Sequence, residues 1–119
     1  MSSFREAIEA RDLDAAVRLL AEDVVFRSPA VHRPYEGRDN VEAILRAAMA
    51  TFEDFRYERE FTDERGHAVV FTARVGDRDV EGCDFLRTNA AGEIDEFVVM
   101  VRPLSGLTAL AQAMAVKLS

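Results

Sequence analysis

Four strand-like segments follow one another through the second half of the chain. They cover residues 55–62, 67–75, 79–88 and 94–102. Short turn signals separate them at Arg65-Gly66, Gly76-Asp77 and Ala91-Gly92. Connections this short join antiparallel neighbours, because a parallel crossover needs about a dozen residues or more. The pattern therefore predicts an antiparallel meander.

Helical patterns come before the meander. Ser3 and Glu6 form a capping-box pattern at the start of a first short helix, and Asp12 is placed to cap a second one. A strand over residues 24–30 and a loop over residues 31–38 are expected to follow.

A longer helix is expected between that loop and the meander. Asp39 and Glu42 repeat the capping-box pattern, and an apolar stripe then continues to Phe52. After the meander, Pro103 should end the last strand and Ser105 should cap a final helix. The order of elements predicts an α+β fold with its helices on one face of a curved antiparallel sheet.

Length and charge limit the organisation and the partners. A chain of 119 residues that is 49% hydrophobic supports one domain over residues 1–119. The net charge of -7, without a basic stripe, disfavours nucleic acid and anionic membranes. We expect a cytoplasmic protein, because the charged N-terminal segment lacks the apolar core of a signal peptide. Lys117 is the one lysine, a bias typical of a bacterial genome of high GC content.

The sequence predicts neither a metal nor a cofactor. Cys83 is the single cysteine, so no intrachain disulfide is possible, and no metal-ligating residues flank it at a suitable spacing. A glycine-rich phosphate loop and a Ser/His/Asp or Cys/His set are also missing from the pattern. A phosphate-bearing cofactor is therefore not expected.

The strand over residues 79–88 carries an acidic residue on an otherwise apolar face. Alternation places Asp84 on the same face as Val80, Gly82 and Leu86. If the sheet curls around the long helix, this is its concave face. The other residues expected there are Phe55, Tyr57, Phe61, Val69, Phe71, Ala73, Val75, Phe97, Val99 and Val101.

Two interpretations of Asp84 are possible from the residues. Apolar surroundings disfavour the charged form, which would raise the pKa of the carboxyl group and suit it to proton transfer. Alternatively, the carboxylate is ionised and held by an arginine or a backbone donor as part of the core.

The opposite face of the sheet predicts an interface between two copies of the chain. Cys83, Phe85, Val98 and Met100 should project from it, and an apolar patch of this kind is typical of a partner surface. We expect a homodimer packed sheet to sheet. The alternative is that the C-terminal helix covers this patch within one chain.

Four segments carry a resemblance to a known family. They are AEDVVFRSP (21–29), YEGRDNVEAIL (35–45), EGCDFLRTNAAGEIDEF (81–97) and VMVRPLSGLTAL (99–110). The chain resembles the SnoaL-like polyketide cyclases of the nuclear-transport-factor-2-like (NTF2-like) superfamily. The resemblance implies a cystatin-like α+β cone whose pocket opens at one end, but this fold hosts many functions.

Related enzymes imply different residues at the site. In the pattern of ketosteroid isomerases, a tyrosine, a base and a protonated acid would fall at Phe4, Ser28 and Asp84, so one of the three polar groups remains. In the pattern of limonene epoxide hydrolases, an arginine and a second aspartate would fall at Gly82 and Val99. SnoaL-type cyclases need one acid/base aspartate in an apolar pocket, and Asp84 meets that minimum.

Other residues are weaker site candidates. His32, in the loop expected at the pocket mouth, is an auxiliary acid/base candidate, although a loop histidine is more often solvated. Tyr57 could donate a hydrogen bond to a ligand carbonyl or send its hydroxyl to the rim. The remaining expected ligand contacts are Phe71, Leu86, Phe97, Val99, Val101, Ser28 and Phe4.

Two functions remain open from the sequence. The first is a small-molecule-binding cyclase or isomerase that acts on a hydrophobic, carbonyl-containing, polyketide-like substrate through Asp84. The second is a ligand-binding or dimeric interaction module without catalysis, which the apolar Phe4 and the small Ser28 would suit.

Overall fold

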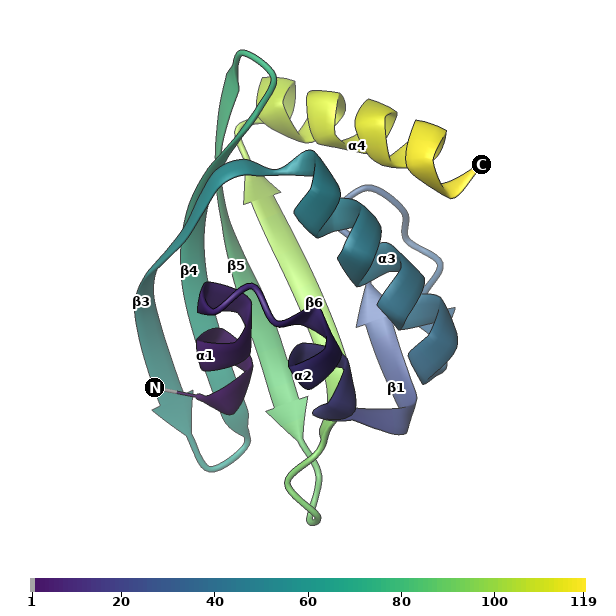
Figure 1. Cartoon of the computed structure of the whole chain (residues 1–119), viewed down its shortest axis with the longest axis vertical. Helices are drawn as coiled ribbons and strands as arrows, with labels where there is room; N and C mark the ends of the chain where they lie inside the picture. Colours follow the sequence, from purple (N-terminus) through teal and green to yellow (C-terminus); the bar gives the residue numbers. More distant parts are fainter. Residues whose placement is uncertain (1) are drawn as a thin grey trace.

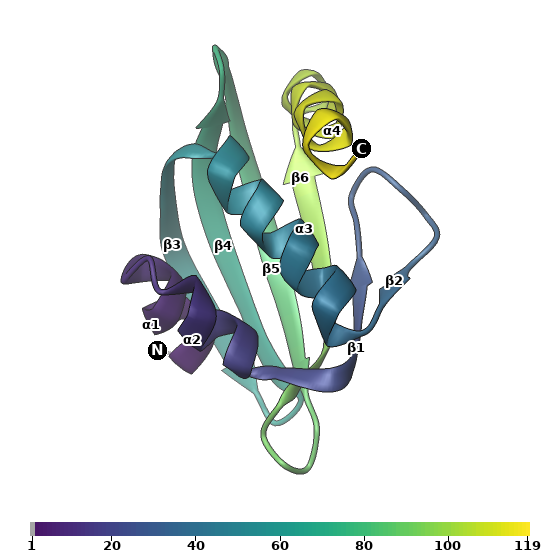
Figure 2. The same ribbon diagram turned by 45° about the vertical axis from the view of Figure 1, so that its right-hand side comes forward.

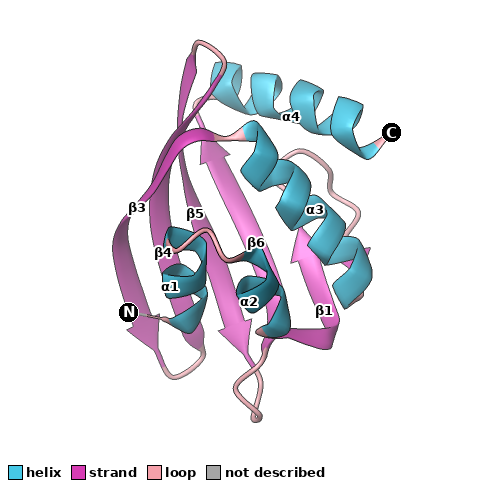
Figure 3. Cartoon of the chain, in the orientation of Figure 1, coloured by secondary structure: helices cyan, strands magenta, loops and turns pink. Residues whose placement is uncertain are grey.

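Over the described residues, a six-stranded curved sheet has four helices on one side (Figures 1 and 3). The computed structural model describes residues 2–119. Its helices are α1 (Ser3–Glu9), α2 (Leu13–Arg18), α3 (Arg38–Thr51) and α4 (Leu104–Leu118). Its strands are β1 (Leu20–Arg27), β2 (Tyr35–Glu36), β3 (Glu53–Asp63), β4 (Gly66–Val75), β5 (Arg78–Thr88) and β6 (Ile94–Arg102).

The sheet has the order β2-β1-β6-β5-β4-β3. The last four strands form the predicted antiparallel meander, and β1 returns to pair in parallel with β6. Three of the glycines in or beside the turns, Gly66, Gly76 and Gly92, have positive φ angles, which glycine adopts without steric cost. The α+β class, with helices on one face of a curved sheet, is therefore confirmed.

The helices lie inside the curve of the sheet (Figure 2). Val41, Ile44 and Leu45 of α3 are buried against it, as the apolar stripe predicted. In α1, the ring of Phe4 packs edge to face on Phe97 of β6, with the ring centroids 5.3 Å apart. None of the described helices combines the length and the apolar character needed to cross a membrane.

The last helix also lies on the concave side. Leu110 and Met114 of α4 line the same cavity as residues of α3 and the inner sheet face. In addition, Gly106 of α4 comes so close to Val80 that a Cβ there would overlap the valine side chain. The alternative in which the C-terminal helix covers the outer patch is therefore wrong.

Several helix starts differ from the capping-box predictions. Ser2, rather than Ser3, caps α1 by accepting a hydrogen bond from the backbone N–H of Arg5. Gly37 precedes α3 and Pro103 precedes α4, so neither Asp39 nor Ser105 is a cap. The prediction for α2 is confirmed, because Asp12 accepts from the N–H of Ala15.

The predicted loop over residues 31–38 contains a short strand. Tyr35 pairs with Phe26 across β1 and β2, and the two rings lie 6.4 Å apart between centroids. Two residues are too few for a periodic signal, so packing on β1 rather than local pattern specifies β2.

Phe61 lies on the opposite face from the one predicted. The register of β3 against β4 shifts between Tyr57 and Arg59, where β3 carries one extra residue. Such a bulge reverses the inward and outward alternation beyond it. Phe61 is consequently 54% exposed, whereas the neighbouring Glu60 side chain is only 9% exposed.

Candidate active site

One cavity of about 390 Å³ lies between the inner sheet face, α3, α4 and the loop that follows β1. Its wall is almost entirely apolar. Phe55 of β3 and Phe71 of β4 stack with centroids 4.9 Å apart, and Phe52 lies 5.5 Å from Phe71. Asp84 supplies the one carboxyl side chain in the wall, and the described lining residues include no Lys, Arg or His. The volume and the composition are typical of a small-molecule site.

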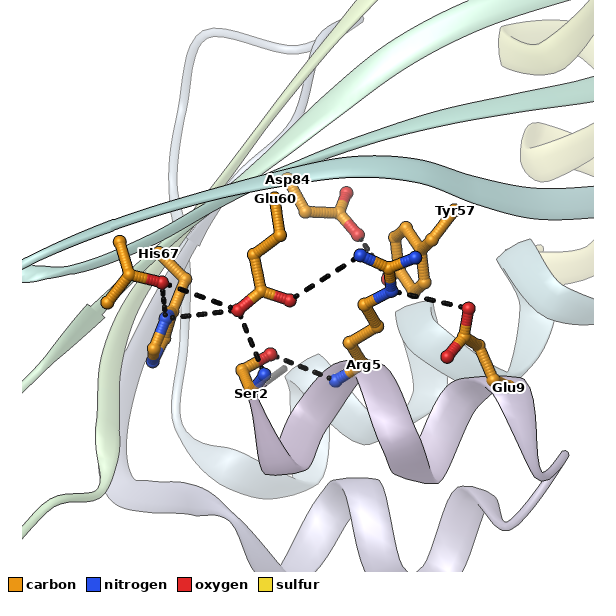
Figure 4. Close-up of polar contacts among 8 residues, drawn as sticks. Ser2, Arg5, Glu9, Tyr57, Glu60, His67 and Asp84 are labelled. Carbon is orange, nitrogen blue, oxygen red and sulfur yellow. Dashed lines mark hydrogen bonds and ion pairs between the residues drawn. The ribbon is translucent and has the colours of Figure 1, made fainter.

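Asp84 is held in the middle of β5. Its neighbours across the sheet are Val69 of β4 and Val99 of β6, so the carboxyl group is flanked by apolar side chains. The residue is only 6% exposed. The hydroxyl of Tyr57 donates a hydrogen bond to its Oδ2 at 2.7 Å (Figure 4).

Burial controls the protonation of Asp84. Desolvation raises the pKa of its carboxyl group from 3.8 to about 7, and the hydrogen bond from Tyr57 acts in the opposite direction. None of the ion pairs among residues 2–119 includes Asp84. The arginine-held alternative is therefore not what the structure contains, and the group can exist in both forms near neutral pH.

Tyr57 stays protonated as the partner of Asp84. Burial, followed by the nearby Asp84 charge, raises the pKa of its phenol well above the usual value. The sequence predicted that the Tyr57 hydroxyl would point to a ligand or to the rim of the pocket. The hydrogen bond to Asp84 was not predicted. The two residues are on β3 and β5, with β4 between them, so turn signals and strand pairing did not reveal the contact.

Replacing Tyr57 by Phe is expected to raise the pKa of Asp84 above about 7. The variant removes the hydrogen bond that favours the ionised carboxylate and leaves the ring in place. The measurement is a carboxyl-carbon NMR titration of Asp84. Tyr35→Phe is a matched control, since Tyr35 also lines the cavity but makes no hydrogen bond to Asp84. An unchanged or lower pKa in Tyr57→Phe would contradict the described pairing.

The other predicted site residues divide into two groups. Phe71, Phe97, Val99 and Ser28 line the cavity together with Tyr57 and Asp84. Leu86 and Phe4 are buried in the core, Val101 packs at its edge, and none of the three lines the cavity.

His32 is exposed and does not line the cavity either. Its neighbours Ala30 and Val31 do contribute to the wall. The auxiliary acid/base role of His32 remains a prediction without support from its position.

The helical part of the wall was not among the predicted contacts. Met49 and Phe52, at the end of α3, line the cavity together with Leu110 and Met114 of α4. The Thr51 hydroxyl also contacts the Met114 sulfur at 3.8 Å. The apolar stripes of both helices identified these residues as buried, but a stripe does not distinguish core packing from a cavity wall.

A second polar cluster lies under α1, outside the cavity (Figure 4). The Glu60 carboxylate accepts a 2.9 Å hydrogen bond from the backbone N–H of Ser2, and His67 approaches it at 3.4 Å. Arg5 pairs with Glu9 at 3.3 Å and with Glu60 at 3.9 Å. These contacts attach α1 to β3, next to the strand segment that carries Tyr57.

Solved structures of other proteins share the fold of this chain. A steroid delta-isomerase from Pseudomonas aeruginosa is 45% identical, with a TM-score of 0.90, over 95% of this chain and 84% of that one. An uncharacterised bacterial protein with a cystatin-like fold, from Silicibacter pomeroyi, is 34% identical, with a TM-score of 0.91, over 97% and 82% of the two chains.

A more distant structure shares the fold alone. It is a putative ketosteroid isomerase from Kribbella flavida, 21% identical with a TM-score of 0.69, over 85% of this chain and 73% of that one. A search of the curated proteins found no match. The model of the SnoaL-like domain matches residues 2–97, and the chain belongs to this SnoaL-like family within the NTF2-like superfamily.

Proposed function

We propose that the protein transfers protons on a hydrophobic, carbonyl-containing small molecule, as a cyclase or an isomerase. The observation that carries this proposal is the single carboxyl group in an apolar cavity, with a pKa of about 7. General acid/base catalysis is most effective when the pKa lies near the working pH. The 45% identity to a protein described as a steroid delta-isomerase supports the same class of chemistry.

Asp84 can perform both halves of such a reaction. Its ionised carboxylate removes a proton from the carbon next to the ligand carbonyl, and the electrons of that C–H bond become an enolate. In an isomerisation, the resulting acid returns the proton to another carbon of the conjugated system. In a ring closure, the enolate carbon attacks a second carbonyl group, and Asp84 gives the proton to the new alkoxide oxygen. Tyr57 acts as a positioning residue that holds Oδ2 and leaves Oδ1 for the ligand.

The site differs from the arrangements implied by two related enzyme classes. Phe4 is buried against Phe97 and brings no hydroxyl to the cavity, and Ser28 offers no base. The ring of Phe71 occupies the space beside Gly82, and Val99 stands opposite Asp84. Asp84 must therefore act without a second carboxylate from the described wall.

The experiment is proton exchange in deuterated water, followed by NMR. A panel of hydrophobic cyclic ketones and β,γ-unsaturated ketones is incubated with the protein at neutral pH. Faster loss of the signals from protons next to the carbonyl, relative to buffer alone, supports the proposal. If ligands bind but their protons do not exchange faster, the result supports a non-catalytic binding module. Phe4 and Ser28, which stand in place of catalytic polar groups, are consistent with that alternative.

We also propose that two copies pair through the outer face of the sheet. Phe85 lies opposite Val98, and Cys83 lies opposite Met100, so the four side chains form one patch across β5 and β6. Phe85 is 39% exposed and Met100 is 59% exposed. Ion pairs from Arg87 to Asp95 and Glu96 border the patch, as polar rims border the apolar centres of interfaces.

Replacing Met100 by Lys is expected to separate such a dimer. The substitution places one charge per copy in the apolar patch, and burying an unpaired charge is costly. Size-exclusion chromatography with light scattering should show a dimer for the unchanged protein and a monomer for the variant. Leu104→Lys is the control, because Leu104 is an exposed apolar residue on α4. A monomeric unchanged protein would refute the dimer.

A further inference from the structure

We propose that the cavity binds hydrophobic monoamines as their ammonium ions, with Asp84 as the counter-ion and the rings of Phe52, Phe55 and Phe71 around the ligand. This ligand class goes beyond the proposed function, because its binding requires no turnover. The proposal depends on the balance of charge in the cavity and on the aromatic wall around the carboxyl group.

Asp84 is the one carboxyl side chain among the described residues that line the cavity. Asp84 Oδ2 accepts its hydrogen bond from a neutral phenol, which does not compensate the charge of an ionised carboxylate. No basic side chain lines the described wall. An uncompensated buried carboxylate is costly, and a ligand that brings one positive charge removes that cost.

The aromatic residues next to Asp84 form a continuous group. Phe55 packs on Tyr57 with centroids 5.0 Å apart and on Phe71 at 4.9 Å. Phe52 adds a third ring, 5.4 Å from Phe55. Aromatic faces attract ammonium groups, and the attraction strengthens when water is excluded. The same wall also gives the apolar body of the ligand a surface to bury.

The comparison that matters is between an amine and a neutral ligand of the same shape. The fold already holds Asp84 away from water, so an entering ammonium group contributes only its own desolvation. It gains the attraction of the carboxylate in a medium of low dielectric constant. A neutral ligand is not attracted by the charge of the Asp84 carboxylate, and its entry removes the remaining water from that carboxylate at a cost in binding free energy. The amine should therefore bind more tightly whenever Asp84 is ionised.

Few other titratable groups influence this pair. Tyr57 from β3 bonds to Asp84, Cys83 lies beside it on β5, and Tyr35 from β2 lines the cavity. From α1, Arg5 and Glu9 lie close enough to act on Tyr57 with opposite signs. The described lining residues from α3, α4, β4 and β6 carry no charge. The ionisation of Asp84 should therefore dominate the pH dependence of amine binding.

The test compares N,N-dimethyl-(1-naphthyl)methylamine with 1-isobutylnaphthalene, in which a CH group replaces the protonated nitrogen. Binding is followed by naphthalene fluorescence at about pH 8, where the amine is protonated and Asp84 is mostly ionised. We expect the amine to bind at least about tenfold more tightly than its carbon analogue. In Asp84→Asn, the two ligands should bind within about threefold of each other.

Glu42→Gln is the matched control, since it makes the same chemical change at a half-buried position on α3 that does not line the cavity, and it should keep the preference. Equal binding of the two ligands, tighter binding of the hydrocarbon, or an amine preference that survives in Asp84→Asn would each overturn the proposal. Proton exchange on ketones is measured separately, so loss of the amine preference and loss of proton transfer are distinguishable.

Discussion

Asp84→Asn is expected to lower the rate of proton transfer by about 10²- to 10⁴-fold, the range typical of a general acid/base group. Asparagine keeps the shape of the side chain and can still accept the hydrogen bond from Tyr57. It cannot take up and return a proton in the relevant pH range. The affinity for a neutral ketone should therefore change little, and the loss of activity should appear as a lower kcat. The measurement is steady-state kinetics on a ketone that shows exchange.

The control for this variant is its stability at different pH values. The raised pKa means that the folded state binds the Asp84 proton more tightly than the unfolded state. The free energy of unfolding therefore falls as the pH rises from about 4, where Asp84 ionises in the unfolded chain, to about 7, where it ionises in the folded protein. The total decrease is on the order of 4 kcal/mol. Asp84→Asn avoids this cost and should be at least as stable as the unchanged protein at about pH 8. Unchanged kcat would exclude Asp84 as the acid/base group, and earlier melting at that pH would indicate a structural role.

Phe71→Ala is expected to lower the free energy of unfolding by about 3–5 kcal/mol. The Phe71 ring is almost completely buried, stacks on Phe55 and lies over Gly82. Its removal deletes these contacts and enlarges the cavity beside Asp84. Urea denaturation measures the loss, and ligand binding should weaken in the same variant because the wall is incomplete.

Phe61→Ala is the matched control for that change. Phe61 is on the neighbouring strand but projects outward beyond the bulge in β3, where its ring contacts Arg59. At protein concentrations too low for self-association, Phe61→Ala should lower the free energy of unfolding by no more than about 1 kcal/mol. Equal destabilisation by the two substitutions would contradict the reversal of alternation in β3.

The meander was predictable because two independent signals agreed. Alternation defined the strands from 79–88 and 94–102 to within a residue of β5 and β6, and glycines marked the turns. The long helix was equally clear, since its stripe from Val41 to Phe52 matches the buried side of α3. Asp84 was identified because a carboxyl group stood on an apolar face, which is a local property of the sequence.

The rest depended on interactions between distant parts of the chain. The bulge near Tyr57 leaves no mark in the alternation, so Phe61 was placed on the wrong face. Ser2 and Ser3 are adjacent, so the sequence alone did not settle which serine caps α1, and α3 starts after Gly37 without a side-chain cap. The contact of Tyr57 with Asp84 crosses an intervening strand, so neither the turns nor the pairing of neighbouring strands predicts it.

The measurement that tests this account most directly is the pKa of Asp84 in the unliganded protein. A carboxyl-carbon NMR titration, assigned by comparison with Asp84→Asn, should show this group titrating at about 7. That result would place a desolvated proton-transfer group in the apolar cavity and support both the acid/base role and the pairing with amines. A pKa at or below the usual 3.8 would mean that the carboxylate stays ionised and well solvated or paired, and it would contradict the proposed chemistry.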